Sequence, residues 1–192
     1  MKLLKKIELW WKFNGRYMHN EFASGVKNLW RWFPTIWRDR DWDGDFIFEI
    51  LRVKLEHQAK YIGDRDIHTR AKTDAEKMRL VAKLIKLHQE DFYGTEYIDY
   101  HKTNFHFVPT DETGKWYTME DEMVSEKFEE YFDKYPRQYK RVLSGEVNRF
   151  KRDIEYTSDK KLIAMEIAHE NHERCRKLIF KIMEREIEGW WD

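Results

Sequence analysis

Apolar residues recur every three or four positions along most of this chain, which is the spacing of one face of an α-helix. The longest such pattern covers residues 34–62, where two adjacent apolar stripes extend along the helix. Their members are Phe46, Ile50, Val53 and His57, and Ile47, Leu51, Leu55, Gln58 and Ile62. A second long pattern covers residues 158–188 and begins with Ser158-Asp159, residue types that cap a helix. We expect these two helices at the centre of the fold.

Shorter helices are predicted around these two. Residues 2–13 and 21–33 form the first pair, ended by Asn14-Gly15 and by Pro34, which should kink or restart the helix. Residues 63–66 have the composition of a loop. Thr73 and Glu76 have the spacing of a capping box, at the start of a helix that should end near Gly94. Further helices are predicted over 95–107, over 120–134 and in a short segment between Pro136 and Gly145.

One segment predicts β-structure. Residues 108–115 have the composition of a loop, and the residues after it suit a short strand, so a small β-hairpin is expected near 108–118. The chain contains only three prolines and eight glycines, which favours long helices over many short strands. The predicted fold class is therefore all-α, a compact bundle of about five to seven helices.

The length of 192 residues predicts a single helical domain, 1–192. Residues 1–20 contain a short amphipathic helix, which we expect to dock on the body of the domain; binding to a membrane surface is the alternative. The chain has no run of about eighteen apolar residues, so no membrane-spanning segment and no membrane partner are expected. The N-terminal segment also lacks the continuous apolar stretch of a signal peptide.

Charge and cysteine content exclude several classes of protein. Thirty-six basic and thirty-six acidic residues give a formal charge of zero, so sequence-independent binding to nucleic acid is not expected. The single cysteine, Cys175, excludes an intrachain disulfide and a four-cysteine zinc site, and we expect it to be a small core residue. Phosphate-binding glycine loops and nucleophile motifs are absent. No cofactor is predicted.

The segment 37–43 combines charged and aromatic residues most densely. It consists of Trp37, Arg38, Asp39, Arg40, Asp41, Trp42 and Asp43. Arginine can bind a phosphate, tryptophan can stack on a base, and aspartate can accept from ribose or base donors. The alternative is structural: the acidic residues complement a helix start, the arginines neutralise them, and the rings enter the core. We retain the segment as a predicted ligand-binding site.

The last helix supplies the other candidate residues. His172 and Arg176 lie along one edge of it, and we expect them to converge with 37–43 on one pocket. Glu166 and His169 have the Glu-x-x-His spacing of di-iron bundles, with Asp45 and Glu49 as further carboxylates. A partner Glu-x-x-His is missing, so these residues are weak metal candidates and no metal site is predicted.

Two stretches carry a resemblance to known sequences. One is LWRWFPTIWRDRDWD at 29–43, and the other is the tail, with His172, the segment 178–182 and the terminal Trp190-Trp191-Asp192. They resemble an uncharacterised family of small proteins encoded by tailed bacteriophages, which share a W-x-D-R-D-W-D segment and a C-terminal W-W-D. The resemblance implies a phage source and a location in the host cytoplasm. It implies no activity.

Three functions follow as hypotheses. The first is a non-enzymatic binding protein of the infected cell, which counters host defence by sequestering a small nucleotide signal or binds a host protein. The second is a virion or assembly component, with Trp10-Trp11 and Trp190-Trp191 as interface anchors. The third is a metal-dependent enzyme with a carboxylate and histidine site. Self-association, most commonly as a cyclic dimer, is compatible with each.

Overall fold

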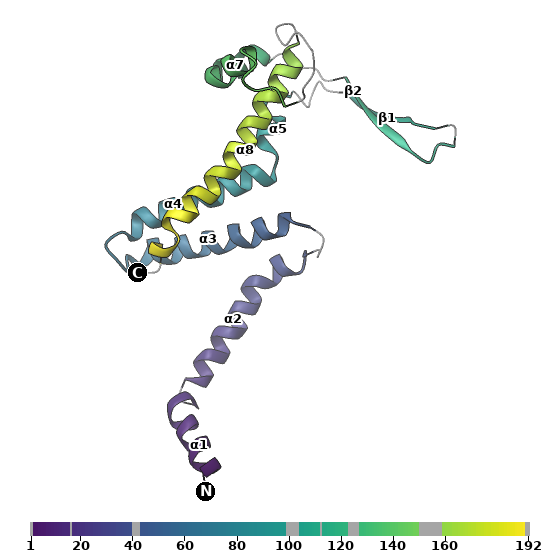
Figure 1. Ribbon diagram of the computed structural model, residues 1–192. Coiled ribbons are helices and arrows are strands. Elements are labelled where there is room, and N and C mark those ends of the chain that lie inside the picture. The colour runs from purple at the N-terminus through teal and green to yellow at the C-terminus, as the bar shows by residue number, and fades with distance from the viewer. Residues whose placement is uncertain are drawn as a thin grey trace. The chain divides into compact units, whose positions relative to one another are not determined.

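The computed structural model describes residues 2–15, 17–39, 43–98, 104–111, 113–122, 127–149 and 159–190. Over these ranges the chain forms eight α-helices and one antiparallel β-hairpin, which confirms the all-α class with a small hairpin (Figure 1). The chain divides into two compact units, Met1–Ile50 and Leu51–Asp192. Whether they behave as the single predicted domain stays a prediction. None of the helices in the described ranges is long and apolar enough to span a bilayer.

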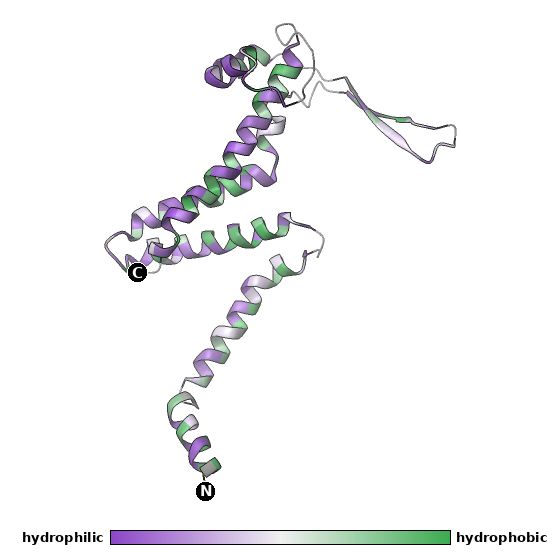
Figure 2. Ribbon diagram, in the orientation of Figure 1, coloured by the Kyte–Doolittle hydropathy of each residue, from purple (hydrophilic) through white to green (hydrophobic). Residues whose placement is uncertain are grey.

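The first unit consists of α1 (Lys2–Trp10), a π-helical turn, η1 (Trp11–Gly15), α2 (Met18–Ile36) and the start of α3 (Asp45–Arg65). A Cβ atom at Gly15 would lie 2.8 Å from the Trp11 ring, so a larger residue at this position would displace that ring. Along α1 and α2 apolar residues are interspersed with polar ones, as in amphipathic helices (Figure 2). The predicted helices at 2–13 and 21–33 are therefore present, with shifted ends.

The predicted helix over 34–62 is wrong in its first third. Pro34 lies inside the last turn of α2, which continues to Ile36. Near a helix end a proline costs little, because few hydrogen bonds remain to be lost after it. The next helix, α3, begins only at Asp45, where Asp43 Oδ1 accepts a hydrogen bond from the Asp45 N–H at 2.9 Å. It includes residues 63–65 of the predicted loop and ends before Asp66, whose φ of 48° is left-handed.

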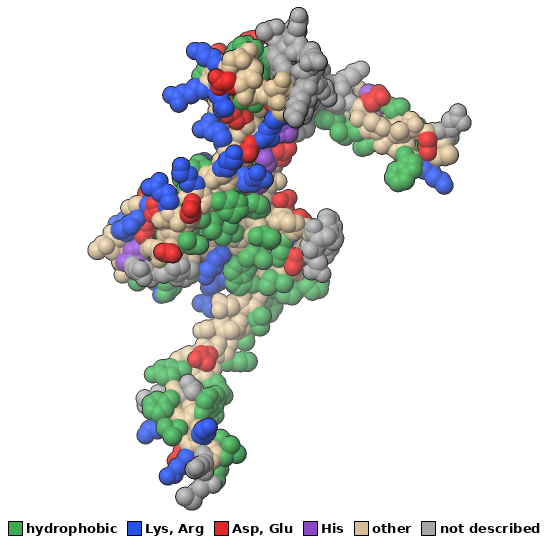
Figure 3. All heavy atoms as spheres, in the orientation of Figure 1, with side chains coloured by type: hydrophobic (Ala, Val, Ile, Leu, Met, Phe, Trp, Pro, Cys, Tyr) green, Lys and Arg blue, Asp and Glu red, His purple; other side chains and the backbone are tan. Residues whose placement is uncertain are grey.

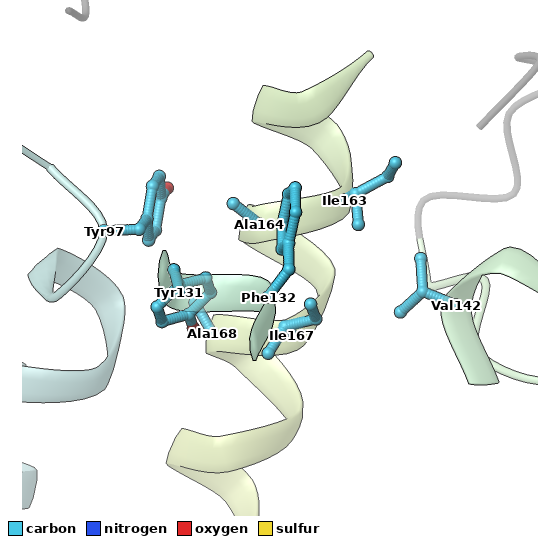
Figure 4. Packing of buried hydrophobic residues seen from close by; sticks show 8 residues of the cluster. All are labelled: Tyr97, Tyr131, Phe132, Val142, Ile163, Ala164, Ile167 and Ala168. Atoms are coloured by element: carbon cyan, nitrogen blue, oxygen red, sulfur yellow. The ribbon is translucent and has the colours of Figure 1, made fainter. Parts of the chain in front are cut away.

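The second unit is organised around α8 (Lys160–Glu186), which packs against α4 (Ala71–Gln89), α5 (Phe92–Thr95), α6 (Phe128–Lys134) and α7 (Pro136–Leu143). The start of α8 confirms the predicted cap, because Asp159 Oδ1 accepts from the N–H groups of Lys161 and Leu162. One core cluster combines apolar residues of α8 with rings from α6 and the segment after α5 (Figure 4). Its members are Tyr97, Tyr131, Phe132, Val142, Ile163, Ala164, Ile167 and Ala168.

The capping box predicted at Thr73 is wrong. α4 begins at Ala71, so Thr73 and Glu76 lie within the helix, and no side chain caps its start. Asp74 instead lies buried in the first turn, where its carboxylate is 3.4 Å from the Arg70 guanidinium. A negative charge in the first turn complements the helix dipole, which is an alternative to a cap.

The hairpin occupies two segments for which helices were predicted. Strand β1 (Asn104–Pro109) pairs with β2 (Tyr117–Glu122), and Phe107 lies opposite Met119. The predicted helix over 95–107 is therefore wrong, because α5 ends at Thr95, residues 96–98 are turn and coil, and the strand begins at Asn104. Of the helix predicted over 120–134, the described residues form a helix only in α6. Apolar residues alternate with polar ones over 104–107 and 117–120, which is the two-residue period of a strand. The chain ends in a 3₁₀ turn, η2 (Glu188–Trp190).

Candidate functional site

The main candidate site is a pocket along the middle of α8, which we call the α8 pocket. Its volume is about 460 Å³, within the range of small-molecule sites. α8 contributes the largest share of its lining, and α4, α5 and the segment around the start of α7 contribute the rest. The lining residues are Leu84, Tyr93, Tyr135, Gln138, Asn171, Arg174, Cys175, Lys177, Leu178 and Lys181.

Two buried amide side chains lie at the α7 side of the pocket. Gln138 Nε2 donates a hydrogen bond to Asn171 Oδ1 at 3.3 Å, and both residues are buried. Each amide offers both donors and an acceptor, so the pair can exchange part of its bonding with a ligand. A buried polar pair of this kind can fix the orientation of a bound ligand.

Two tyrosines supply flat surfaces. Burial raises the pKa of Tyr135, and so does its hydroxyl donating to Glu96 Oε2 at 2.8 Å. Burial, followed by the nearby Cys175, raises the pKa of Tyr93. Both phenols are therefore neutral hydrogen-bonding groups at physiological pH. Their rings offer stacking surfaces for a planar ligand.

Cys175 is a buried member of the core, as predicted. Its Sγ lies 3.4 Å from the Leu84 carbonyl oxygen, to which the thiol donates. Burial raises the pKa of the thiol, although the hydrogen bond with Tyr93 opposes that effect. Because the thiolate is the nucleophilic form, this cysteine is poorly suited to covalent catalysis.

Three basic residues line the exposed side of the pocket at i, i+3 and i+7 of α8. Lys177 Nζ lies 2.9 Å from Glu173 Oε1, and this hydrogen bond is the main reason that the pKa of Glu173 is lowered. Arg174 and Lys181 line the pocket without a carboxylate partner in the described part of the chain. Their positive charge makes this side of the pocket attractive to an anion.

The predicted segment 37–43 belongs to the first unit. Trp37 is exposed, with its ring centroid 5.2 Å from that of Phe33, and Arg38 is exposed too. Asp39 is partly buried, and Asp43 caps α3, which agrees with the structural alternative for that residue. The other three predicted residues, Arg40, Asp41 and Trp42, lie outside the described residues.

His172 and Arg176 belong to the second unit, but neither lines the α8 pocket. His172 lines a smaller cavity of about 310 Å³; its ring centroid lies 4.2 Å from that of His88, and its Nδ1 3.3 Å from Asp91 Oδ1. Arg176 lies on a shallow exposed surface beside Phe180. The expected convergence of these two residues with 37–43 stays a prediction.

The weak metal candidates do not form a cluster. Glu166 is buried and accepts a hydrogen bond from the Arg149 backbone N–H at 3.0 Å, whereas His169 is exposed. Asp45 and Glu49 belong to the first unit. Across the described ranges, no group of three or more His, Cys, Asp or Glu side chains is placed to hold a metal ion. The metal-dependent hypothesis therefore gains no support from these residues.

One predicted interface anchor is wrong. Trp190 is only 2% exposed, because the η2 turn places its ring in the core. A buried ring cannot contact a neighbouring protein, so the virion hypothesis loses Trp190 as an anchor; Trp191, its predicted companion, lies outside the described residues. Trp10 and Trp11 are exposed, as an anchor requires.

None of the residues that line the α8 pocket was predicted as a ligand-binding residue, and Cys175 was predicted only as a core residue. The basic row Arg174, Lys177 and Lys181 has a helical spacing that charge patterning alone could have found. Gln138 and Asn171 left no such signal, because their pairing joins positions far apart in the sequence.

No family model, no curated protein and no solved structure matches this chain. The resemblance to a phage family therefore stays a prediction.

Proposed function

We propose that this protein is a non-enzymatic binding protein whose α8 pocket takes a small anionic ligand with a planar ring, and that this ligand is of the nucleotide class. The observation that carries the proposal is the combination of groups in one pocket. Tyrosine rings can stack on a base, the Gln138–Asn171 amide pair can hydrogen-bond to its edge, and Arg174 and Lys181 can bind a phosphate.

The ionisable side chains that line the α8 pocket favour binding over catalysis. The only thiol in the chain, Cys175, has a raised pKa. The two tyrosine hydroxyls have raised pKa values as well, so neither is a base at neutral pH. The pocket thus offers complementary contacts and lacks an activated nucleophile among its described lining residues.

The phage resemblance supplies a biological setting for this proposal. A protein in the cytoplasm of an infected bacterium that holds a nucleotide tightly would lower the concentration of that nucleotide. If the nucleotide is a defence signal, the host response is weakened. Capture of a host protein is the other form of this binding hypothesis.

The test is a thermal-shift screen followed by calorimetric titration against mononucleotides, cyclic dinucleotides and ADP-ribose derivatives. A ligand present at 100 times its Kd should stabilise the protein by about 2.7 kcal/mol. Arg174→Ala and Lys181→Ala should each weaken binding about tenfold, because each removes a charge-assisted contact.

Arg176→Ala is the matched control, since Arg176 lies on the same helix outside the pocket. It should leave the affinity unchanged. A loss of affinity with Arg176→Ala and none with Arg174→Ala would place the ligand at the His172 and Arg176 edge instead. A screen without any saturable shift would contradict nucleotide binding.

A further inference from the structure

The two N-terminal helices expose the apolar faces that their sequences create. On α1 and the start of η1 the face consists of Leu3, Leu4, Ile7, Trp10 and Trp11, and on α2 of Met18, Phe22, Val26, Leu29, Phe33 and Ile36. These side chains are between 38% and 75% exposed, and no residue of α2 is buried. Continuous exposed apolar surface of this kind marks an interaction site.

The polar faces of the same helices are basic. Residues 1–36 contain seven Lys or Arg and two Glu, so this segment carries a formal charge of +5. The remaining 156 residues contain twenty-nine basic and thirty-four acidic residues, which gives −5. In Figure 3 apolar and basic side chains lie next to one another on the surface of the N-terminal helices. The partner that suits this segment is therefore both apolar and anionic.

We propose that α1 and α2 lie on the surface of an anionic lipid bilayer. Apolar side chains, with Trp10 and Trp11 among them, enter the boundary between headgroups and acyl chains, where tryptophan is preferred. Lysines such as Lys5, Lys6 and Lys27 bind the lipid phosphates. Neither helix crosses the bilayer, because a polar face extends along each. The surface-binding alternative for the N-terminal helix thus takes precedence over docking on the body.

This proposal is independent of the nucleotide pocket, which lies in the second unit. The charge distribution makes it testable with the full chain. Residues 37–192 are acidic overall, so they should be repelled by an anionic surface. Binding to anionic vesicles must then arise from residues 1–36.

The experiment is flotation of the full-length protein with vesicles of phosphatidylcholine alone and of phosphatidylcholine with about one-third phosphatidylglycerol, at low and high salt. The protein should float with the anionic vesicles and stay behind with the neutral ones. Raising the salt from about 0.1 M to 0.5 M should reduce the partition coefficient about tenfold. Lys5→Gln, Lys6→Gln and Lys12→Gln together should reduce it about a hundredfold, because three basic residues near the lipid surface are removed.

Two matched double variants separate the apolar face from charge alone. Phe22→Asp with Leu29→Asp adds two negative charges to the apolar face of α2, and should abolish flotation. Ser24→Asp with Asn28→Asp adds the same two charges to the polar face, and should reduce flotation only moderately. Because all four positions are exposed, both variants should unfold at the temperature of the parent protein.

Equal flotation with neutral and anionic vesicles, or none with either, would overturn the proposal. So would equal losses in the two double variants. Sedimentation velocity tests whether a second copy of the chain covers this face instead. If the parent protein does not float and forms a dimer that Phe22→Asp with Leu29→Asp dissociates, the face is a dimer interface and lipid binding is rejected.

Discussion

α2 and α8 both carry apolar stripes with helical period, yet their side chains have opposite fates. On α8 Ile167 and Ile179 are fully buried, whereas on α2 Leu29 is 70% and Phe33 53% exposed. The two helices are similar in kind, with charged residues on their polar faces. The difference is the neighbours: α8 packs against four helices of the second unit. The helical spacing of apolar residues therefore predicts that a helix forms, but it does not predict which elements pack against its apolar face.

The largest expected difference between the two helices is in the cost of removing an apolar side chain. Ile167→Ala removes a fully buried side chain from the core cluster and should lower the free energy of unfolding by about 2–5 kcal/mol. Leu29→Ala, on the exposed face of α2, should change it by less than about 0.5 kcal/mol. Urea denaturation followed by circular dichroism measures both. Similar losses would contradict the contrast between the helices.

A second difference between the two helices is that α8 contains a buried charged side chain, Glu166, whereas α2 contains no buried residue. Glu166→Ala removes the acceptor for the Arg149 backbone N–H and should cost about 1–3 kcal/mol of unfolding free energy. Glu184→Ala, at an exposed position on the same helix, serves as the control and should cost less than about 0.5 kcal/mol. If the two variants unfold at the same urea concentration, Glu166 has no structural role.

Surface charge in the second unit should contribute a smaller, pH-dependent amount. The hydrogen bond from Lys77 Nζ, at 2.5 Å, is the main cause that lowers the pKa of Glu186 from its ordinary value of 4.5, and Arg70 adds to it. A lowered folded-state pKa means that the stabilisation is present above pH 4.5 and is lost as the pH decreases through the folded pKa.

Glu186→Gln should accordingly lower the melting temperature at pH 7 by at most about 2 °C. Near pH 3 the difference between variant and parent should be smaller or absent. Melting curves recorded between pH 3 and pH 7 provide the measurement. A difference that increases on acidification would have the wrong sign for this ion pair.

The smallest effect is expected from removing the N-terminal helices. Deletion of residues 1–36 removes no buried side chain of α2, so the urea midpoint of the remaining chain should stay within experimental error. If the deletion instead lowers the unfolding free energy by several kcal/mol, the helices pack on the rest of the protein, as the docking interpretation of residues 1–20 requires.

Local signals in the sequence predicted some helices and strands correctly and others wrongly. Asp159 before a long apolar period located the start of α8, because the cap and the period agree. Thr73 and Glu76 misled, because the capping-box spacing also occurs inside helices. The first half of β1 was missed, because Phe105 and Phe107 were taken for loose helical spacing. The start of β2 at Tyr117 and Thr118 was predicted as a strand, whereas its continuation to Glu122 was not.

The candidate site was harder to predict than the fold. The basic row on α8 is visible in the sequence, but its meaning depends on Tyr93, Tyr135 and Gln138, which other elements contribute to the same pocket. The densest charged and aromatic segment, 37–43, was the more obvious sequence signal. At its last residue, Asp43, the structure shows a helix cap.

By itself the sequence determined the helical class, the position of the last helix and the amphipathic, basic character of the N-terminal segment, because these depend on neighbours within a few residues. Tertiary structure alone decided that Trp190 is buried and that Gln138 meets Asn171. It also decided that the apolar stripe of α8 is covered while that of α2 is exposed. These outcomes depend on contacts between residues distant in the chain, which a local period cannot encode.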